Sequence, residues 1–249
     1  MRRVFVAPDQ LRGERVALTG EAHHHLARVL RARVGDGVVV FDGLGTEWSA
    51  EVVSIARQST TLRLGERRVG ATAAPAARIT LLQALARGEK MDFIIQKTCE
   101  LGVARVTPVF TLRTTPGPAT PAAASARHQR WERIAREAAR QSGRADVPIV
   151  DGPQPLEAAM AAAPAGDRRF VFWESADAPP LRAVLATAPG HSAGTTLLVG
   201  PEGGFSSAEI AQAEAAGFVA VGLGPRILRV ETAAVVAVAL LQFAAGGLG

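Results

Sequence analysis

The feature that most constrains the fold is a regular alternation of strand-like and helix-like segments that begins at Arg78. Each strand-like segment is a short apolar run, and apolar residues at helical spacing follow it. Such a pattern is typical of a parallel sheet covered by helices on both faces. The strand-like segments are 78–85, 104–111, 147–152, 168–174, 195–200 and 218–224, and the helix-like ones are 89–103, about 125–142, 155–163, 180–188, 207–217 and 231–245. We therefore predict an α/β domain over residues 78–249.

Residues 1–70 show a different pattern, in which short strands dominate. The strand-like segments are rich in valine, threonine and aromatic residues, and glycine and aspartate separate them. One helix, predicted over 21–34, interrupts them and ends before Gly35. Several short strands with one helix indicate a small β-barrel. The small-residue stretch 71–77 is interpreted as a linker between the two domains.

Composition excludes several classes of protein. The longest apolar run near the C-terminus, 233–241, is too short to span a membrane. The N-terminus lacks the apolar stretch of a signal peptide. A single cysteine, Cys99, permits no internal disulfide, in agreement with a reducing compartment. We therefore expect a cytoplasmic protein with no membrane contact.

The charge distribution points to a polyanionic partner. The chain has a formal net charge of +5. Eight arginines but only two acidic residues lie between 105 and 144, an excess of 8 − 2 = +6. A GC-rich genome would explain much of the arginine content, but it does not explain this concentration in one region. A nucleic acid fits such a surface.

Two glycine-rich stretches follow predicted strands and precede predicted helices. They are LLVGPEGGFSSAEI at 197–210 and GLGPRILR at 222–229. Ligands of parallel α/β sheets bind at the carboxyl ends of strands, and glycine lets a ligand approach the backbone. Neither stretch is a GxGxxG or phosphate-loop motif. From the residues alone, a ligand site and tight turns needed only for folding are equally supported.

The last predicted helix has its own signals. Thr232 is a candidate start residue, and Glu231 suits the positive end of the helix dipole. The small and β-branched residues of 233–241 favour a buried core helix.

The predicted helix at 125–142 is amphipathic. Trp131, Ile134 and Ala138 form an apolar stripe. Beside it lies a basic stripe of Arg133, Arg136, Arg140 and Arg144. A solvated face is the simplest interpretation of a charged stripe, but few acidic residues interleave it, so we favour phosphate contact.

Three consecutive histidines, His23 to His25, lie on the first predicted helix. Consecutive helical side chains point in three directions and no cysteine follows, so we expect no metal site. Arg28 and Arg31, one and two turns further on, would extend a nucleic-acid surface onto the first domain.

Five stretches together resemble the RsmE-type 16S ribosomal RNA methyltransferases of the SPOUT superfamily. The resemblance covers essentially the whole chain, and the stretches occur in the family's order. They are HLARVLR with VGDGVVVFDG, GEKMDFIIQKTCELGV at 88–103, RWERIAREAARQSGR at 130–144, LLVGPEGGFS at 197–206 and LGPRILRVETA at 223–233.

The resemblance implies a PUA-like β-barrel over 1–70 and an α/β domain with a deep trefoil knot over 78–249. It implies S-adenosyl-L-methionine as cofactor, a homodimer with the cofactor site beside the partner subunit, and no metal. The implied substrate is 16S rRNA of the small ribosomal subunit, methylated at N3 of uridine 1498 in rRNA numbering.

The resemblance also assigns roles to residues. The cofactor-binding residues would be Phe172, Trp173, Glu174, Leu198, Val199, Gly200, Pro201, Glu202, Gly203, Gly204, Leu223, Gly224, Pro225, Ile227, Leu228, Arg229 and Thr232. Independently of the resemblance, we expect RNA binding by Arg3, His25, Arg28, Arg31, Lys97, Arg133, Arg136 and Arg140. Two positions depart from the family: Arg140 stands where an acid is frequent, and Val230 where threonine is usual.

Catalysis at uracil N3 needs a flipped base, a place for the N3 proton and stabilisation of the resulting negative charge. Arg144 or Arg113 is the candidate for the charge. Glu100, Glu202, Glu231 and solvent are candidates for the proton, although Glu100 and Lys97 can equally form a structural ion pair on one helix. Two alternatives stay open: another SPOUT reaction, at a ribose 2′-oxygen or on tRNA, and a non-catalytic RNA-binding assembly factor.

Overall fold

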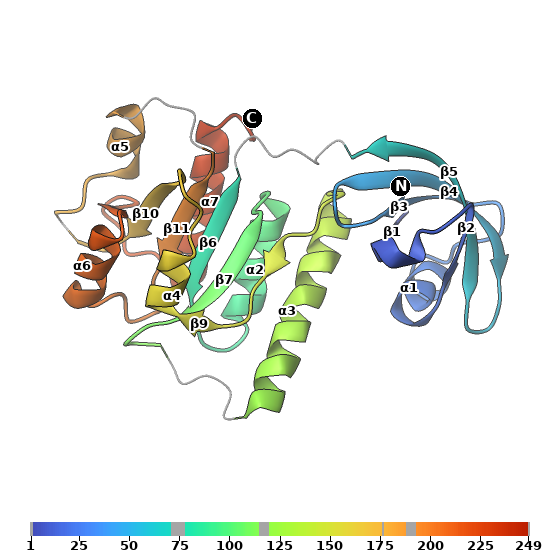
Figure 1. Cartoon of the computed structure of the whole chain (residues 1–249), viewed down its shortest axis with the longest axis horizontal. Helices are drawn as coiled ribbons and strands as arrows, with labels where there is room; N and C mark the ends of the chain where they lie inside the picture. The colour runs from blue at the N-terminus through green and yellow to red at the C-terminus, as the bar shows by residue number, and fades with distance from the viewer. Residues whose placement is uncertain (1, 71–77, 115–119, 176, 188–192, 249) are drawn as a thin grey trace. The chain divides into compact units, whose positions relative to one another are not determined.

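The computed structural model describes residues 2–70, 78–114, 120–175, 177–187 and 193–248. The chain divides into two compact units (Figure 1). The first comprises Met1–Ala74 with Arg136–Val147, and the second Pro75–Ala135 with Pro148–Gly249. The predicted α/β domain includes residues 136–147, whereas the structure groups them with the first unit. The predicted linker at 71–77 lies outside the described residues.

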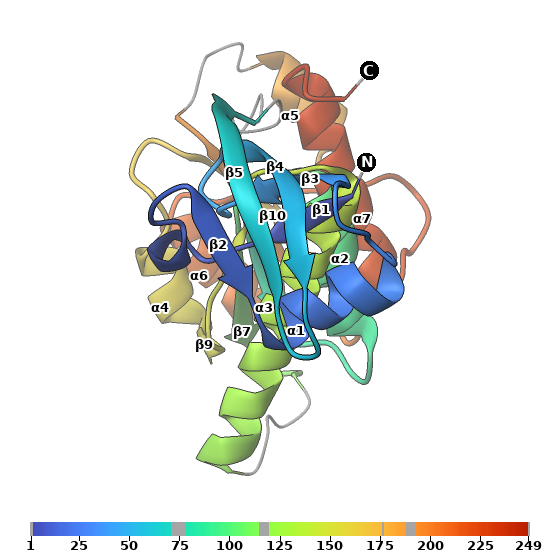
Figure 2. The same ribbon diagram turned by 90° about the vertical axis from the view of Figure 1, so that its right-hand side faces the viewer.

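The first unit contains a five-stranded mixed sheet with the strand order β1-β3-β4-β5-β2, whose strands β2, β5 and β4 lie in front in Figure 2. Its strands are β1 (Arg3–Phe5), β2 (Arg15–Leu18), β3 (Gly37–Phe41), β4 (Thr46–Ile55) and β5 (Thr60–Val69). Strand β1 pairs in parallel with β3, and the other pairs are antiparallel. The short helix η1 (Pro8–Gln10) precedes β2. Leu26, Val40, Val52 and Leu62 form the fully buried centre of this unit.

The helix of the first unit is shorter than predicted. It begins as α1 (Gly20–His24) and continues as a π-helical segment η2 (His25–Val29). It ends there because Arg31 adopts a left-handed conformation, with φ of 49°, and the Ala32 N–H donates to the Leu26 carbonyl at 3.0 Å. Arg31 therefore lies beyond the helix, and the prediction of a helix to residue 34 is wrong.

Backbone contacts explain why residues 136–147 belong to the first unit. The Gly45 N–H donates to the Ala145 carbonyl at 3.2 Å, and the Val147 N–H donates to the Gly43 carbonyl at 2.9 Å. Gly70 packs so tightly that a Cβ atom there would lie 2.2 Å from the Ala145 Cβ. The segment 143–147, which follows the helix with the basic stripe, is thus an integral part of this unit.

The second unit is built on a parallel sheet with the strand order β12-β10-β11-β6-β7-β8, with β9 also paired to β7. The strands are β6 (Ile79–Ala84), β7 (Arg105–Phe110), β8 (Ile149–Val150), β9 (Gln154–Pro155), β10 (Arg168–Phe172), β11 (Thr195–Val199) and β12 (Val219–Val221). The helices of this unit are α2 (Lys90–Glu100), α4 (Leu156–Ala161), α5 (Leu181–Thr187), α6 (Ser207–Ala215) and α7 (Val230–Ala244). Helix α3 (Pro121–Ser142) begins in this unit, and its residues from Arg136 belong to the first. The prediction of an α/β unit with a parallel sheet is confirmed.

Helices cover both faces of this sheet. Neighbouring residues of a strand point to opposite faces, and both Leu81 and Leu82 are buried. In Figure 1, α4 and α6 lie on one side of the sheet, and α2 and α7 on the other. The apolar stripe predicted on α3 is also confirmed, since Trp131 and Ala138 are buried.

Helix α7 differs from its prediction in two ways. It begins at Val230 with Arg229 as its N-cap, so Thr232 is not the start residue. It is buried on only one face, because Leu240 and Phe243 are exposed. No helix in the described part of the chain is long and apolar enough to cross a membrane.

Candidate functional site

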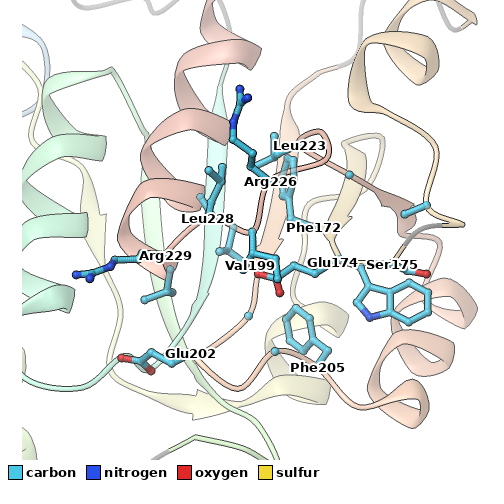
Figure 3. Close-up of a pocket in the computed structure, with 18 of the residues that line it drawn as sticks. Phe172, Glu174, Ser175, Val199, Glu202, Phe205, Leu223, Arg226, Leu228 and Arg229 are labelled. Carbon is cyan, nitrogen blue, oxygen red and sulfur yellow. The ribbon is translucent and has the colours of Figure 1, made fainter.

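A cleft of about 940 Å³ opens where β10, β11 and β12 end. Segments that follow these strands line most of it: 172–175, 199–205 and 221–230. Both glycine-rich stretches therefore meet in one cleft (Figure 3), as expected at the carboxyl edge of a parallel sheet. Its volume lies within the range of small-molecule sites, roughly 300–1,000 Å³.

Several points of the cleft wall favour glycine. A Cβ atom on Gly200 would lie 3.1 Å from the Phe205 ring, and one on Gly203 would lie 3.3 Å from the Arg113 side chain. Gly204 and Gly224 have φ of +66° and +108°, conformations that other residues rarely adopt. The absence of side chains at these glycines thus avoids close contacts with Phe205 and Arg113 and leaves room in the cleft.

The lining combines apolar surface with a few charged groups. Phe172, Val199 and Leu228 supply apolar walls. In Figure 3 the Glu174 side chain points into the cleft, whereas the Arg226 and Arg229 guanidinium groups point away from it. The exposed Glu174 carboxylate can accept hydrogen bonds from a ligand's hydroxyl or ammonium groups.

Glu202, the acid of the first glycine-rich loop, is held from α2. Its Oε1 accepts hydrogen bonds from the Arg87 N–H at 3.0 Å and from the Lys90 Nζ at 2.9 Å. Partial burial alone would raise the pKa of Glu202, but these hydrogen bonds outweigh it and lower the pKa below the ordinary 4.5. Glu202 is therefore ionised at neutral pH.

Lys90 also faces Glu231, on the first turn of α7. The Lys90 Nζ lies 3.9 Å from the Glu231 Oε2, an atom that is buried and accepts no hydrogen bond from the described residues. One ammonium group thus lies between the first glycine-rich loop and the start of α7.

Arg113 reaches the cleft from the loop that follows β7. Its Nη1 donates to the Gly203 carbonyl at 2.7 Å, and its side chain is otherwise exposed. Among the predicted candidates for catalysis, Arg113 and Glu202 belong to the cleft lining.

Of the predicted cofactor residues, all but two line the cleft. Leu198 is fully buried in the core beneath it, and Thr232 is exposed on α7 outside it. The structure adds residues that the sequence analysis did not select: Lys90, Ser175, Ala178, Pro180, Phe205, Val221, Gly222, Arg226, Val230 and Ala233. Most of them are neighbours in the sequence of the predicted cofactor-binding residues, so extending each predicted segment by a few residues includes them.

The other catalytic candidates lie elsewhere. Arg144 is buried in the first unit, where its Nη2 donates to the Asp146 Oδ2 at 2.5 Å. Glu100 forms the ion pair with Lys97 that the sequence left open, at 2.8 Å. Arg144 and Glu100 therefore have structural partners, and Glu231 is outside the lining.

The predicted RNA-binding residues divide by exposure. Arg28, Arg31 and Arg133 are exposed. Arg3 does not fit the prediction, because its largely covered guanidinium donates to the Glu47 Oε1 at 2.6 Å and the Arg144 carbonyl at 3.0 Å. It also lies 5.2 Å from the centre of the Phe41 ring, so its role is structural.

Two arginines near the end of α3 also have partners within the protein. The Arg136 guanidinium lies over the Phe5 ring, at 5.8 Å, and Arg140 pairs with Glu137. His25 is half-buried; desolvation and the nearby Arg140 lower its pKa below 6.5, although Glu137 opposes the shift. His25 is therefore neutral at pH 7.

The histidine run does not converge on one point. His23 is buried and hydrogen-bonds the Thr60 hydroxyl at 2.8 Å, whereas His24 is exposed. Within the described ranges, no group of three histidine, cysteine or acidic side chains is arranged to hold a metal ion.

Comparisons with known proteins agree with this geometry. Residues 72–242 match the family described as "RNA methyltransferase domain", and residues 18–64 match "RNA methyltransferase PUA domain". The chain is 34% identical over 240 residues to the ribosomal RNA small subunit methyltransferase E of Synechocystis, covering 96% of this chain and 77% of that protein. It is 30% identical to the same enzyme of Bacillus subtilis, covering 98% and 96%.

Solved structures of methyltransferases are also similar to this chain over nearly its whole length. An enzyme of this name from Neisseria gonorrhoeae, bound to S-adenosyl methionine, superimposes with a TM-score of 0.86 at 32% identity, over 98% of this chain and 97% of that one. A methyltransferase of Legionella pneumophila, also with this cofactor, gives a TM-score of 0.87 at 30% identity over 97% of both chains.

Proposed function

Because the chain belongs to the RNA methyltransferase family and carries that family's PUA domain, we propose that it methylates 16S ribosomal RNA at N3 of uridine 1498, using S-adenosyl-L-methionine. The observation that carries the proposal is the cleft at the ends of β10, β11 and β12. The cleft has the volume of a small-molecule site and glycine-rich walls, and Arg113 lies at it from the loop that follows β7.

The cleft fits the cofactor chemically. Apolar walls at Phe172, Leu223 and Leu228 suit the adenine ring, and the exposed Glu174 carboxylate suits ribose hydroxyls or the ammonium group. When bound, S-adenosylmethionine supplies an electrophilic methyl group. The residues of the cleft orient the two reactants, and this alignment is the main catalytic contribution that such a reaction needs.

Arg113 is the residue that we assign to the uracil. Deprotonated uracil carries negative charge on N3 and its carbonyl oxygens, and a guanidinium group at the cleft stabilises that charge. Arg144 drops out of this role because its guanidinium is buried against Asp146 in the first unit.

The N3 proton goes to solvent in this proposal. The lowered pKa makes Glu202 a weak base, because the Arg87 N–H and Lys90 stabilise its ionised form. Glu100 is engaged by Lys97 and Glu231 lies outside the cleft lining.

The RNA is proposed to contact exposed arginines. Arg28 and Arg31 on the first unit and Arg133 on α3 present free faces to solvent. Arg136, Arg140 and His25 are half-buried and contribute with their exposed edges. Arg3 and Lys97 are left out, since Glu47 and Glu100 engage them.

The protein is proposed to be a cytoplasmic homodimer. Exposed apolar side chains on packed helices support the dimer: Phe93 on α2, and Leu240 and Phe243 on α7. Such residues suit a buried interface better than water. Gel filtration with light scattering tests the dimer, and Phe243→Glu is expected to weaken it.

A deep trefoil knot in the second unit is also proposed. Strand β10 lies between β11 and β12 in the sheet, and the loops after all three meet at the cleft. Chains are otherwise almost always unknotted, so tracing the three loops in an experimental electron-density map is the test.

The decisive experiment transfers label from S-adenosylmethionine to unmodified small subunits, naked rRNA and tRNA in parallel, and identifies the modified nucleoside. We expect 3-methyluridine in 16S rRNA. Label on a ribose or on tRNA would contradict the substrate, and RNA binding without transfer would make the protein a non-catalytic binder. Arg113→Ala is expected to lower the single-turnover rate by roughly 10²–10³. Arg182→Ala, on exposed α5, is the control.

A further inference from the structure

The loop that carries Arg113 is attached to the molecule through Glu209, a buried acid on α6. Leu112, next to Arg113, donates its backbone N–H to the Glu209 Oε1 at 2.7 Å. Glu209 lies in α6, which follows the first glycine-rich loop and is far from Leu112 in the sequence. A buried, charge-assisted hydrogen bond of this kind is stronger than a neutral one.

The other oxygen of Glu209 caps the helix. Its Oε2 accepts from the Ser206 N–H at 2.8 Å and from the Ser206 hydroxyl at 2.9 Å, and the Glu209 N–H donates back to the Ser206 Oγ at 3.3 Å. This reciprocal pair is a capping box. The two oxygens therefore have separate partners: one holds the start of α6, and the other holds the Arg113 loop.

The loop itself is a closed turn. The Thr114 N–H donates to the Thr111 carbonyl at 3.1 Å, and the Thr111 N–H donates to the Thr114 hydroxyl at 2.9 Å. Because these bonds tie residue 111 to residue 114, a contact at Leu112 fixes the position of the whole turn, including Arg113.

Arg113 provides the second attachment. Its guanidinium donates to the Gly203 carbonyl, and its side chain lies flat over Gly203, where a Cβ atom would come within 3.3 Å. Both attachments end on the stretch 203–209, which joins the glycine-rich loop to α6. The turn is thus fixed directly against the cleft loop.

We propose that Glu209 is a positioning residue that holds Arg113 at the mouth of the cleft. This inference rests on the proposed function, because it assigns Glu209 to the same methyl transfer through Arg113. Displacing a catalytic group by about 1 Å can cost 10²-fold in rate, so a loose turn is expected to slow transfer. A purely structural role, capping α6, would affect stability alone.

The test separates the two tasks of Glu209. Glu209→Ala removes both, and Ser206→Ala removes the hydroxyl contacts of the cap but leaves the bond to Leu112. We expect Glu209→Ala to lower the single-turnover rate of methyl transfer at saturating RNA by about 10–100-fold, and Ser206→Ala by less than about threefold. Glu209→Met keeps about the length of the side chain without an oxygen that could accept either bond, and it replaces Glu209→Ala if that variant does not fold.

Two further readouts make the test specific. In an Arg113→Ala background, Glu209→Ala is expected to change the rate by less than about twofold, since residues that act through one another are not additive. Hydrogen exchange of the Leu112 amide is expected to accelerate at least tenfold in Glu209→Ala, and to stay slow in Ser206→Ala and Arg113→Ala.

Equal rate losses from Glu209→Ala in the wild-type and Arg113→Ala backgrounds would overturn the inference, as would unchanged exchange at Leu112. A wild-type protein that transfers no methyl group would overturn the proposed function instead. The exchange measurement would still decide whether Glu209 holds the loop.

Discussion

The Lys90 ammonium group donates a hydrogen bond of 2.9 Å to the Glu202 carboxylate, which links the first turn of α2 to the glycine-rich loop of the cleft. The same ammonium group lies 3.9 Å from Glu231 on α7. Lys90 therefore links the glycine-rich loop to the start of α7, although it is not among the predicted site residues.

Removing this link is expected to weaken cofactor binding. Lys90→Gln removes the charged hydrogen bond to the Glu202 carboxylate but keeps the one from the Arg87 N–H, so it loosens the loop. Both side chains are partly exposed, so the expected loss in S-adenosylmethionine affinity is modest, about three- to tenfold. Isothermal titration calorimetry measures it. Lys97→Gln, which breaks another ion pair of α2, is the matched control and should leave the affinity unchanged.

The lowered pKa of Glu202 predicts a specific pH dependence of stability. Its folded-state pKa is below the ordinary 4.5, so its contacts contribute fully at neutral pH. Their contribution falls once the pH drops below about 4.5 and is lost as the pH passes through the folded pKa. The difference in Tm between the wild type and Glu202→Gln should therefore shrink on acidification. A difference that grows with acid would contradict the assignment.

Gly200 has a packing reason to lack a side chain. In Gly200→Ala the new methyl group would lie 3.1 Å from the Phe205 ring and push the ring toward the cleft. Overpacking of this kind costs about 1–3 kcal/mol, and we expect ~10-fold weaker cofactor binding. Gly152→Ala is the control, because a Cβ atom there meets nothing within 4 Å. Equal affinities of the two variants would show that Phe205 does not shape the site.

His25 is expected to titrate below pH 6.5, because burial and Arg140 disfavour its charged form. Between the folded-state pKa and 6.5 the unfolded chain binds more protons, so stability should rise with pH in that interval. NMR titration of the His25 ring measures the pKa directly. Arg140→Gln should raise it toward 6.5, and a further fall would contradict the electrostatic cause.

Asp146 is expected to be important for stability. It pairs with the buried Arg144, and Asp146→Ala removes this ion pair. Breaking a buried pair costs roughly 3 kcal/mol, which urea unfolding can detect. Glu51→Ala breaks the exposed pair with Arg63 and should cost less than about 1 kcal/mol. Comparable losses in both variants would exclude a special role for Asp146.

Local patterns predicted most of the second unit. The apolar runs around Leu81 and Leu197 are continuous, which only a sheet covered on both faces explains, and the glycine-rich stretches identified the cleft. The i,i+3 spacing of Lys97 and Glu100 also allowed their ion pair to be foreseen. These features depend on neighbours in the sequence.

Features that depend on distant contacts escaped prediction. The burial of Arg3 requires Glu47 and Arg144, and nothing in the local sequence reveals either partner. The early end of the first helix depends on the left-handed backbone of Arg31, a conformation that arginine rarely adopts. Glu209 was part of an ordinary helix start, and only the fold brings Leu112 to it.

The discontinuity of the first unit has a consequence for biosynthesis. The ribosome releases the chain from its N-terminus, so all five strands of the first unit emerge long before Ala145 and Val147, which bond to Gly45 and Gly43. These hydrogen bonds cannot form until the whole of α3 and the residues after it have been synthesised. Maturation of this unit is thus coupled in time to that of the catalytic one, and a nascent chain stalled before residue 136 should present an incomplete first unit to chaperones and proteases.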